Sequence, residues 1–181
     1  MNELEANESV RAIVITGAGN EAFVAGAEIE EMVDLDTVGM MNLTQVTRVS
    51  FSRIENINKP VIAAINGEAR GGGLELALCA DLRIASENAQ LAFPEINLGV
   101  IPGGGGTQRI QKLVGLGAAK ELLYFGEPID AQRAYQLNIV NKVVPQDKLL
   151  ATAKEWAEKL AQKAPVAIRQ MKLAVNTGSN V

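Results

Sequence analysis

The chain of 181 residues is long enough for one domain with a substantial core, and its 48% hydrophobic and 21% charged residues are typical of a soluble globular protein. A net charge of −4 disfavours nucleic-acid binding, and no apolar run is long enough to span a membrane. Because histidine is absent, the sequence lacks Ser-His-Asp and Cys-His nucleophiles and favoured transition-metal ligands, which leaves acid–base chemistry to carboxylates, tyrosines or lysines.

Apolar periodicity predicts strands and helices in the first part of the chain. In order, we expect a helix tail at 2–8, a buried strand at 10–16, a loop of small residues at 17–26, a mainly helical stretch at 29–57, a second buried strand at 61–65 and a turn at 66–67. The next helix, at 74–80, is apolar on every side except at Glu75. A helix with this pattern is buried.

The second part of the chain continues the alternation of strands and helices. We expect two short strands at 82–85 and 89–93, a glycine-rich loop at 97–106, two helices at 107–114 and 118–125, a further helix at 131–137 and a last strand at 141–144. Asp130 is the expected N-cap of helix 131–137, and Asp147 that of an amphipathic helix through Lys163. A final helix begins at Pro165. The predicted fold class is therefore α/β, in a single domain.

Glu75 is the first candidate for chemistry. A carboxylate in a buried helix must be paired, neutral or functional, because burying an unpaired charge is expensive. The three glycines Gly71, Gly72 and Gly73 precede it. The first N–H groups of a helix have no internal partner and suit a developing oxyanion, but tight packing of the helix against a sheet explains such glycines equally well.

Glu95 is the second candidate. A helix, a turn and a hairpin-like excursion separate it from Glu75, so the two carboxylates could converge. Two carboxylates in one partly buried site can hold different protonation states and divide acid and base roles. The alternative is a surface glutamate that follows Pro94, and the residues by themselves favour that alternative.

Two other glycine motifs resemble nucleotide-binding loops. The segment 17–22 fits the dinucleotide pattern G-x-G-x-x-A, but residues 23–26 are poor helix material, so a plain strand-to-loop turn is favoured. The segment 103–107 lacks the lysine of a P-loop, which excludes a nucleotide triphosphatase. Its four glycines either present backbone donors to an anion or a polarised water, or form a flexible turn.

Five segments taken together resemble the crotonase (enoyl-CoA hydratase/isomerase) superfamily. They occur in order at residues 23–29, 59–67, 71–75, 94–99 and 102–109. The resemblance implies a crotonase-like fold, a spiral of ββα units, in one core domain over residues 1–181. It also implies a chain truncated at both ends, since family members carry a strand and helix before the position of Met1 and further helices after that of Val181.

The resemblance implies roles for particular residues. Ala27 and Gly72 match the two oxyanion-hole positions, whose backbone N–H groups bind a thioester oxygen. Glu75 and Glu95 match the two catalytic glutamates of the hydratase branch. Further positions match substrate-binding residues, among them a backbone donor near the catalytic water at Gly103; these positions are Ala25, Gly26, Ile29, Gly71, Pro94, Leu98 and Gly103.

Both glutamates together imply an enoyl-CoA hydratase, a hydro-lyase of fatty acid metabolism and β-oxidation. It would hydrate 2-trans-enoyl-CoA to 3-hydroxyacyl-CoA, or catalyse the reverse dehydration. We assign Glu95 chiefly as the base toward water, and Glu75 as the acid that protonates the α-carbon. No metal or other cofactor is expected, because CoA is part of the substrate.

The resemblance also implies partners and alternatives. We expect an acyl-CoA substrate and a homo-oligomer, either a trimer or a hexamer, with no nucleic-acid or membrane partner. The single cysteine, Cys79, fits a reducing compartment, so a cytoplasmic location is expected. The alternatives are an enoyl-CoA isomerase that uses one glutamate, or an inactive truncated paralogue that binds CoA thioesters or partner subunits.

Overall fold

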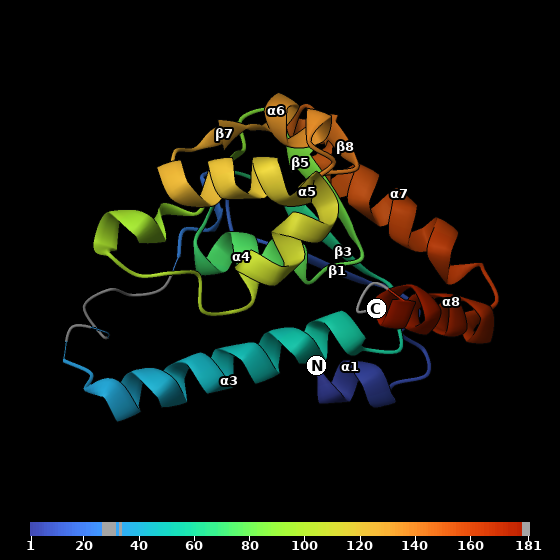
Figure 1. The fold of residues 1–181 in the computed structure, drawn as a ribbon. Helices are drawn as coiled ribbons and strands as arrows, with labels where there is room; N and C mark the ends of the chain where they lie inside the picture. Colours follow the sequence, from blue (N-terminus) through green and yellow to red (C-terminus); the bar gives the residue numbers. More distant parts are fainter. Residues whose placement is uncertain (27–31, 33, 179–181) are drawn as a thin grey trace.

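The computed structural model describes residues 1–26, 32 and 34–178. Within these residues the strands form two four-stranded sheets (Figure 1). The first sheet is parallel, with strand order β1-β3-β5-β8, and its strands are Ile13–Thr16 (β1), Val61–Ile65 (β3), Leu82–Ser86 (β5) and Lys142–Val144 (β8). The second sheet has the order β2-β4-β6-β7, with β7 antiparallel, and its strands are Ala22–Val24 (β2), Glu68–Arg70 (β4), Gln90–Ala92 (β6) and Ile129–Asp130 (β7).

Helices follow pairs of strands. The α-helices are Asn2–Ala6 (α1), Thr37–Asn56 (α3), Gly72–Leu78 (α4), Gly106–Phe125 (α5), Ala131–Gln136 (α6), Leu149–Ala161 (α7) and Pro165–Gly178 (α8). The 3₁₀ turns are Pro94–Leu98 (η1) and Gln146–Lys148 (η2). Each of the first three strand pairs places one strand in each sheet and then leads to α3, α4 or, through η1, α5. This repeated ββα order confirms the predicted α/β class and the crotonase-like spiral.

Strand β3 lies at the centre of the molecule because it is apolar on both faces. Val61, Ala63 and Ile65 face the main core, whereas Ile62 and Ala64 face a second cluster beneath α7. Parallel strands covered on both faces read as continuous apolar runs, which is why the sequence predicted this strand at its observed bounds. The apolar side of α7 covers the outer face of the first sheet, as its amphipathic pattern predicted.

Several boundaries follow from local chemistry. Asp130 caps α6, since its Oδ1 accepts a hydrogen bond of 2.7 Å from the backbone N–H of Arg133. Gly115, with φ of 78°, divides α5 into the two predicted helices. Asp147 is not the cap that the sequence suggested. It lies in η2, and the chain enters α7 through Lys148 in a helical conformation, without a side-chain cap among the described residues.

The sequence missed strands β2, β4 and β7. Each has two or three residues, and β2 and β4 bury a single side chain apiece, Phe23 and Ala69. A single buried position cannot produce the two-residue alternation that identifies a strand in a sequence. These strands exist because their backbones pair with neighbours that are distant in sequence.

Helix α3 is long but poorly buried. All of its residues are described, and none is buried. It begins after Asp36, whose Oδ1 accepts from Gly39 N at 2.7 Å, and it runs beneath α4 toward α1 (Figure 1). Its exposed side chains include Val38, Met41 and Val46. The helices of the described residues, α3 included, fall short of the length and apolarity that a membrane span requires.

The side chain of Asn66 organises the loop that leads into β2. Asn66 is 4% exposed, and its amide nitrogen donates to the carbonyls of Gly19 and Ala22 at 2.9 and 3.0 Å. Its oxygen accepts from the N–H of Gly17 at 3.0 Å. A buried amide with three backbone partners fixes the path of the loop, and so it sets where β2 begins.

We therefore expect Asn66→Ala to reduce the free energy of unfolding by about 2 kcal/mol, because the substitution leaves partly buried backbone groups without partners. Chemical denaturation followed by circular dichroism measures this loss. Asn58→Ala is the matched control, because Asn58 is exposed and bonds to the side chain of Glu5; its effect should stay within about 0.5 kcal/mol. Equal losses in the two variants would contradict the role given to Asn66.

Candidate active site

The three glycines at the start of α4 occupy three different environments. Gly71 has a left-handed φ of 51°, which favours glycine. A Cβ added to Gly73 would lie 1.9 Å from the carbonyl oxygen of Val24, so β2 packs directly against this position. A Cβ added to Gly72 would meet no described atom within 4 Å beyond its own helix and chain neighbours. Tight packing therefore explains Gly73, whereas Gly72 has no such close neighbour among the described residues.

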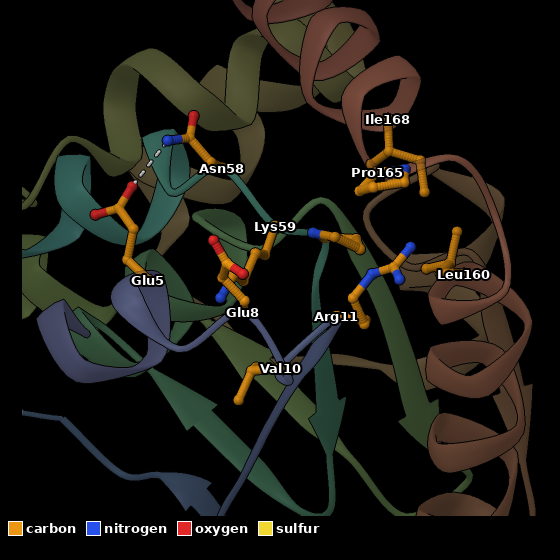
Figure 2. A pocket seen from close by; sticks show the side chains of 10 residues that line it. Glu5, Glu8, Val10, Arg11, Asn58, Lys59, Leu160, Pro165 and Ile168 are labelled. Carbon is orange, nitrogen blue, oxygen red and sulfur yellow. Dashed lines mark hydrogen bonds between the residues drawn. The ribbon is translucent and has the colours of Figure 1, made fainter.

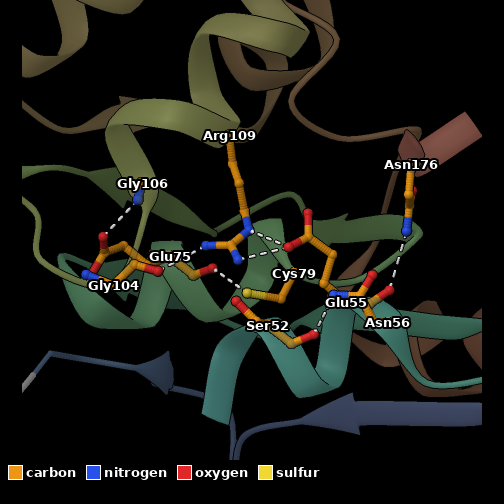
Figure 3. A network of polar contacts seen from close by, with 9 residues as sticks. All are labelled: Ser52, Glu55, Asn56, Glu75, Cys79, Gly104, Gly106, Arg109 and Asn176. Carbon is orange, nitrogen blue, oxygen red and sulfur yellow. Dashed lines mark hydrogen bonds and ion pairs between the residues drawn. The ribbon is translucent and has the colours of Figure 1, made fainter. Parts of the chain in front are cut away.

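Glu75 is paired through backbone hydrogen bonds. The residue is 3% exposed, and its Oε2 accepts from Gly104 N at 3.0 Å while its Oε1 accepts from Gly106 N at 2.7 Å (Figure 3). These donors lie at the start of α5, where the helix dipole also favours a negative charge. The glycine donors that the sequence offered to an anion or a water are thus occupied, at two of the four positions, by the carboxylate of Glu75.

Close packing around this carboxylate requires glycine at both donor positions. A Cβ at Gly104 would lie 2.7 Å from Glu75 Oε2 and also 2.7 Å from the ring of Phe51. A Cβ at Gly106 would lie 2.8 Å from the ring of Phe93 and 2.9 Å from Glu75 Cγ. The glycine run is therefore a closely fitting cradle for Glu75. Glycine is required there for steric reasons as much as for flexibility.

Glu95 is only partly buried and carries an unsatisfied oxygen. It lies in the first turn of η1, and its Oε2 is inaccessible to solvent yet finds no hydrogen-bond partner among the described residues. Burial raises the pKa of Glu95, its own backbone N–H partly offsets this effect, and the nearby charge of Glu75 raises the pKa further. A buried carboxylate oxygen without a partner is rare, and it is suited to meet a ligand or a water.

Gly71 links the two glutamates. A Cβ at Gly71 would lie 3.0 Å from Glu95 Oε1, so the Glu95 carboxylate rests against the residue that begins the turn into α4. The carbonyl of Gly71 accepts from the N–H of Glu75 at 2.9 Å. The structure thus brings Glu75, Glu95, Gly71 and Gly72 to one place, where the carboxylates feel each other's charge.

The other predicted site residues differ in how exposed they are. Ala25 and Gly26 are exposed at the end of β2, and Ala27 and Ile29 lie outside the described residues. Pro94 is half-buried at the start of η1, whereas Leu98 at its end is 58% exposed. Gly103 is exposed and adjoins the side chain of Thr44 from α3.

Arg109 and Glu55 belong to the same network, and sequence reasoning gave them no role. Arg109 Nη1 donates to the carbonyl oxygen of Gly104 at 2.7 Å, and its Nη2 donates to Glu55 Oε2 at 2.8 Å (Figure 3). Arg109 lies within segment 102–109, one of the five that resemble the crotonase superfamily, and this position was the only indication that the sequence gave of a role for it. Glu55 lies on α3, outside those five segments, and no sequence pattern indicated a role for it.

A cavity among the described residues lies away from the glutamates. It encloses about 330 Å³ between the start of the chain, the beginning of β3 and helices α7 and α8 (Figure 2). None of the predicted site residues that the structure describes lines it. Its cations are engaged with carbonyl oxygens, since Arg11 Nη2 donates to Lys163 O at 2.9 Å and Lys59 Nζ donates to Asn7 O at 2.7 Å. The chemistry of the carboxylate pair therefore identifies the candidate site better than cavity size does.

Comparison with known proteins agrees with this site. The sequence profile of the Enoyl-CoA hydratase/isomerase family matches residues 1–180. The short-chain-enoyl-CoA hydratase of Clostridium acetobutylicum is 46% identical over 98% of this chain and 68% of its own length. The crotonyl-CoA hydratase of Syntrophomonas wolfei is 45% identical over 94% of this chain and 65% of its own length. The crystal structure of enoyl-CoA hydratase from Bacillus anthracis matches with a TM-score of 0.96 and 42% identity, covering 99% of this chain and 70% of that one.

Two sheets wound from ββα units, with a pair of glutamates around a glycine-led helix, define a crotonase-like protein. The family match extends over almost the whole chain, and the chain therefore belongs to the enoyl-CoA hydratase/isomerase family. It spans roughly two thirds of the length of the relatives named above.

The different environments of Gly72 and Gly73 predict unequal effects of the same substitution on stability. Gly73→Ala forces a Cβ into the carbonyl of Val24 and should reduce the free energy of unfolding by about 3 kcal/mol. Gly72→Ala meets open space at the first position of a helix, so its stability should stay within about 1 kcal/mol of the parent. Thermal unfolding of both variants tests this, and a Gly72 variant as unstable as the Gly73 variant would refute the assigned geometry.

Proposed function

We propose that this protein is an enoyl-CoA hydratase that adds water to 2-trans-enoyl-CoA to give 3-hydroxyacyl-CoA, or catalyses the reverse dehydration. The observation that carries the proposal is the glutamate pair around Gly71, in which Glu75 is held by two backbone donors and Glu95 keeps an unpaired buried oxygen. Relatives named as hydratases of short-chain enoyl-CoA and crotonyl-CoA support this substrate class.

The oxyanion hole would use the start of α4. Gly72 is the first residue of that helix, so its N–H lacks an intrahelical acceptor, and a Cβ at this position would meet no other part of the described chain within 4 Å. We propose that this N–H and that of Ala27 bind the thioester oxygen as enolate charge develops on it. The polarised carbonyl makes the β-carbon electrophilic, and removing one such donor costs about 3 kcal/mol of transition-state stabilisation in other enzymes.

The contacts of the two glutamates support a division of roles opposite to the one that the sequence suggested. Two N–H donors stabilise the ionised form of Glu75, whereas burial and the charge of Glu75 favour the protonated form of Glu95. When the pair holds one proton, that proton therefore resides on Glu95. We propose that the Glu75 carboxylate accepts the proton of the attacking water and that Glu95 delivers its proton to the α-carbon.

This mechanism needs no cofactor beyond the CoA of the substrate. The electrons that form the C–O bond come from water, and those that form the α C–H bond come from the enolate. The proton that water gives to Glu75 must return to Glu95 to restore the starting state. We also propose an oligomeric state and a location for the protein. Exposed apolar side chains on α3 and α8 support a homo-oligomer, and the free buried thiol of Cys79 supports a reducing, cytoplasmic location.

Hydration of crotonyl-CoA, followed as loss of enoyl-thioester absorbance, tests the function. Glu75→Gln and Glu95→Gln should each lower kcat by about 10²–10⁴-fold, because each removes one proton transfer. The exposed Glu127→Gln is the control and should leave kcat unchanged. Loss at one glutamate combined with migration of the double bond would favour an isomerase. CoA-thioester binding without turnover would favour an inactive paralogue.

The buried position of Glu95 also predicts a pH-dependent effect on stability. Since folding raises the pKa of Glu95, its stabilising contribution is complete below the ordinary value of 4.5 and is lost as pH rises through the folded-state pKa. Glutamine cannot ionise, so Glu95→Gln should unfold at a higher temperature than the parent at neutral pH and at a similar temperature at the acid end. A lower Tm for the variant at neutral pH would show that ionised Glu95 is stabilised in the fold.

A further inference from the structure

Gly104 is held from both sides. Its N–H donates to Glu75 Oε2 at 3.0 Å, and its carbonyl oxygen accepts from Arg109 Nη1 at 2.7 Å (Figure 3). Hydrogen bonds through one residue therefore connect the Arg109 guanidinium to the carboxylate that we propose as the base. Charge-assisted hydrogen bonds of this length are the stronger ones in proteins, which suits them to fixing a loop.

Glu55 in turn holds Arg109. Its Oε2 accepts from Arg109 Nη2 at 2.8 Å and from Nε at 3.3 Å, and the guanidinium side chain is 12% exposed. Two donors of a planar guanidinium on one carboxylate oxygen fix its orientation more strictly than one ammonium contact could. The backbone oxygen of Glu55 also accepts from Asn176 of α8 at 3.3 Å. Glu55 thus has a fixed anchor outside the carboxylate site.

The charges around Glu75 come from several elements. Glu95 faces it from η1, Arg109 from α5 and Glu55 from α3 behind Arg109, while Cys79 lies on α4 itself, near Arg83. Burial raises the pKa of Cys79 to about 12, so the thiol is neutral. Burial alone would lower the pKa of Arg109, but its contacts with Glu55 and the charges nearby, Glu75 among them, raise it. The Arg109 charge therefore persists and is balanced by Glu55.

We propose that Glu55 and Arg109 are a positioning pair for the hydration reaction: Arg109 keeps the N–H of Gly104 on Glu75, and Glu55 orients and balances the guanidinium. The inference rests on the proposed function, and neither residue touches the substrate in this account. The competing explanation is a tie between α3 and α5 that serves stability alone. The two explanations differ in what happens to kcat in enzyme that remains folded.

Removing either partner should shift the protonation of Glu75 in opposite directions. Glu55→Gln leaves the positive charge of Arg109 unbalanced, which favours ionised Glu75 and lowers its pKa. Arg109→Gln removes that charge, frees the carbonyl of Gly104 and leaves Glu55 unbalanced, all of which raise the pKa of Glu75. A role in stability alone predicts lower Tm values for both variants, with the kcat of the folded enzyme retained.

The test measures kcat and KM for crotonyl-CoA across pH in the parent, Glu55→Gln, Arg109→Gln and the double variant. We expect Arg109→Gln to lower kcat by about tenfold or more with little change in KM, because Glu75 loses its orientation. The acid limb of kcat should move to higher pH in Arg109→Gln and to lower pH in Glu55→Gln. In the double variant the shift should be smaller than in Arg109→Gln, since contacting residues are not additive.

Two controls make the outcome specific. Arg109→Lys keeps the charge but cannot hold Gly104 and Glu55 at once, so kcat should fall while the acid limb stays in place. Glu121→Gln removes the exposed ion pair with Arg133 and should change neither quantity. Acid limbs that coincide with that of the parent in both single neutral variants would overturn the proposal.

Failure of the proposed function remains distinguishable from failure of this inference. If the parent does not hydrate crotonyl-CoA, the carboxyl resonance of Glu75 can be titrated by ¹³C NMR in the same variants. Opposite pKa shifts of Glu75 in Arg109→Gln and Glu55→Gln would then still support the positioning pair. An unchanged titration of Glu75 in both variants would reject it, with or without turnover.

Discussion

The hydrogen bonds from Gly104 and Gly106 to the carboxylate of Glu75 are the constraint on which the rest of the site depends. They let a charged side chain sit at 3% exposure in an otherwise apolar helix, where an unpaired carboxylate would destabilise the fold by several kcal/mol. They also join α4 to the start of α5. Because the carboxylate approaches so closely, no side chain larger than hydrogen fits at either donor position.

That constraint separates the two glutamates chemically although they are the same residue type. Glu75 has its acceptor oxygens filled by backbone donors, whereas Glu95 is desolvated, unpaired at Oε2 and close to a negative charge. Such pairs titrate as a unit, and the first proton goes to the site that is worse for an anion. In the proposed mechanism, these different environments are the basis for assigning Glu75 as base and Glu95 as acid.

Features set by local pattern could be predicted from the sequence, and features set by distant contacts could not. The apolar run of β3, the Asp130 cap and the need for a partner at Glu75 are local, and all three appear in the structure. Strands β2 and β4 were missed because they bury one residue each. Asp147 lies in a 3₁₀ turn that no local pattern predicted. The bond of Arg109 to Glu55 joins residues 54 positions apart, so neither pattern nor spacing indicated it.

Titration of the carboxyl resonances of Glu75 and Glu95 by ¹³C NMR, with the Gln variants for assignment, tests the central claim most directly. We predict that Glu95 is the first of the two to take up a proton as pH falls, and that Glu75→Gln lowers the pH at which Glu95 is protonated, since a neighbouring negative charge is removed. If Glu75 is protonated first, the cradle at Gly104 and Gly106 does not hold an anion. The proposed division of base and acid would then be wrong.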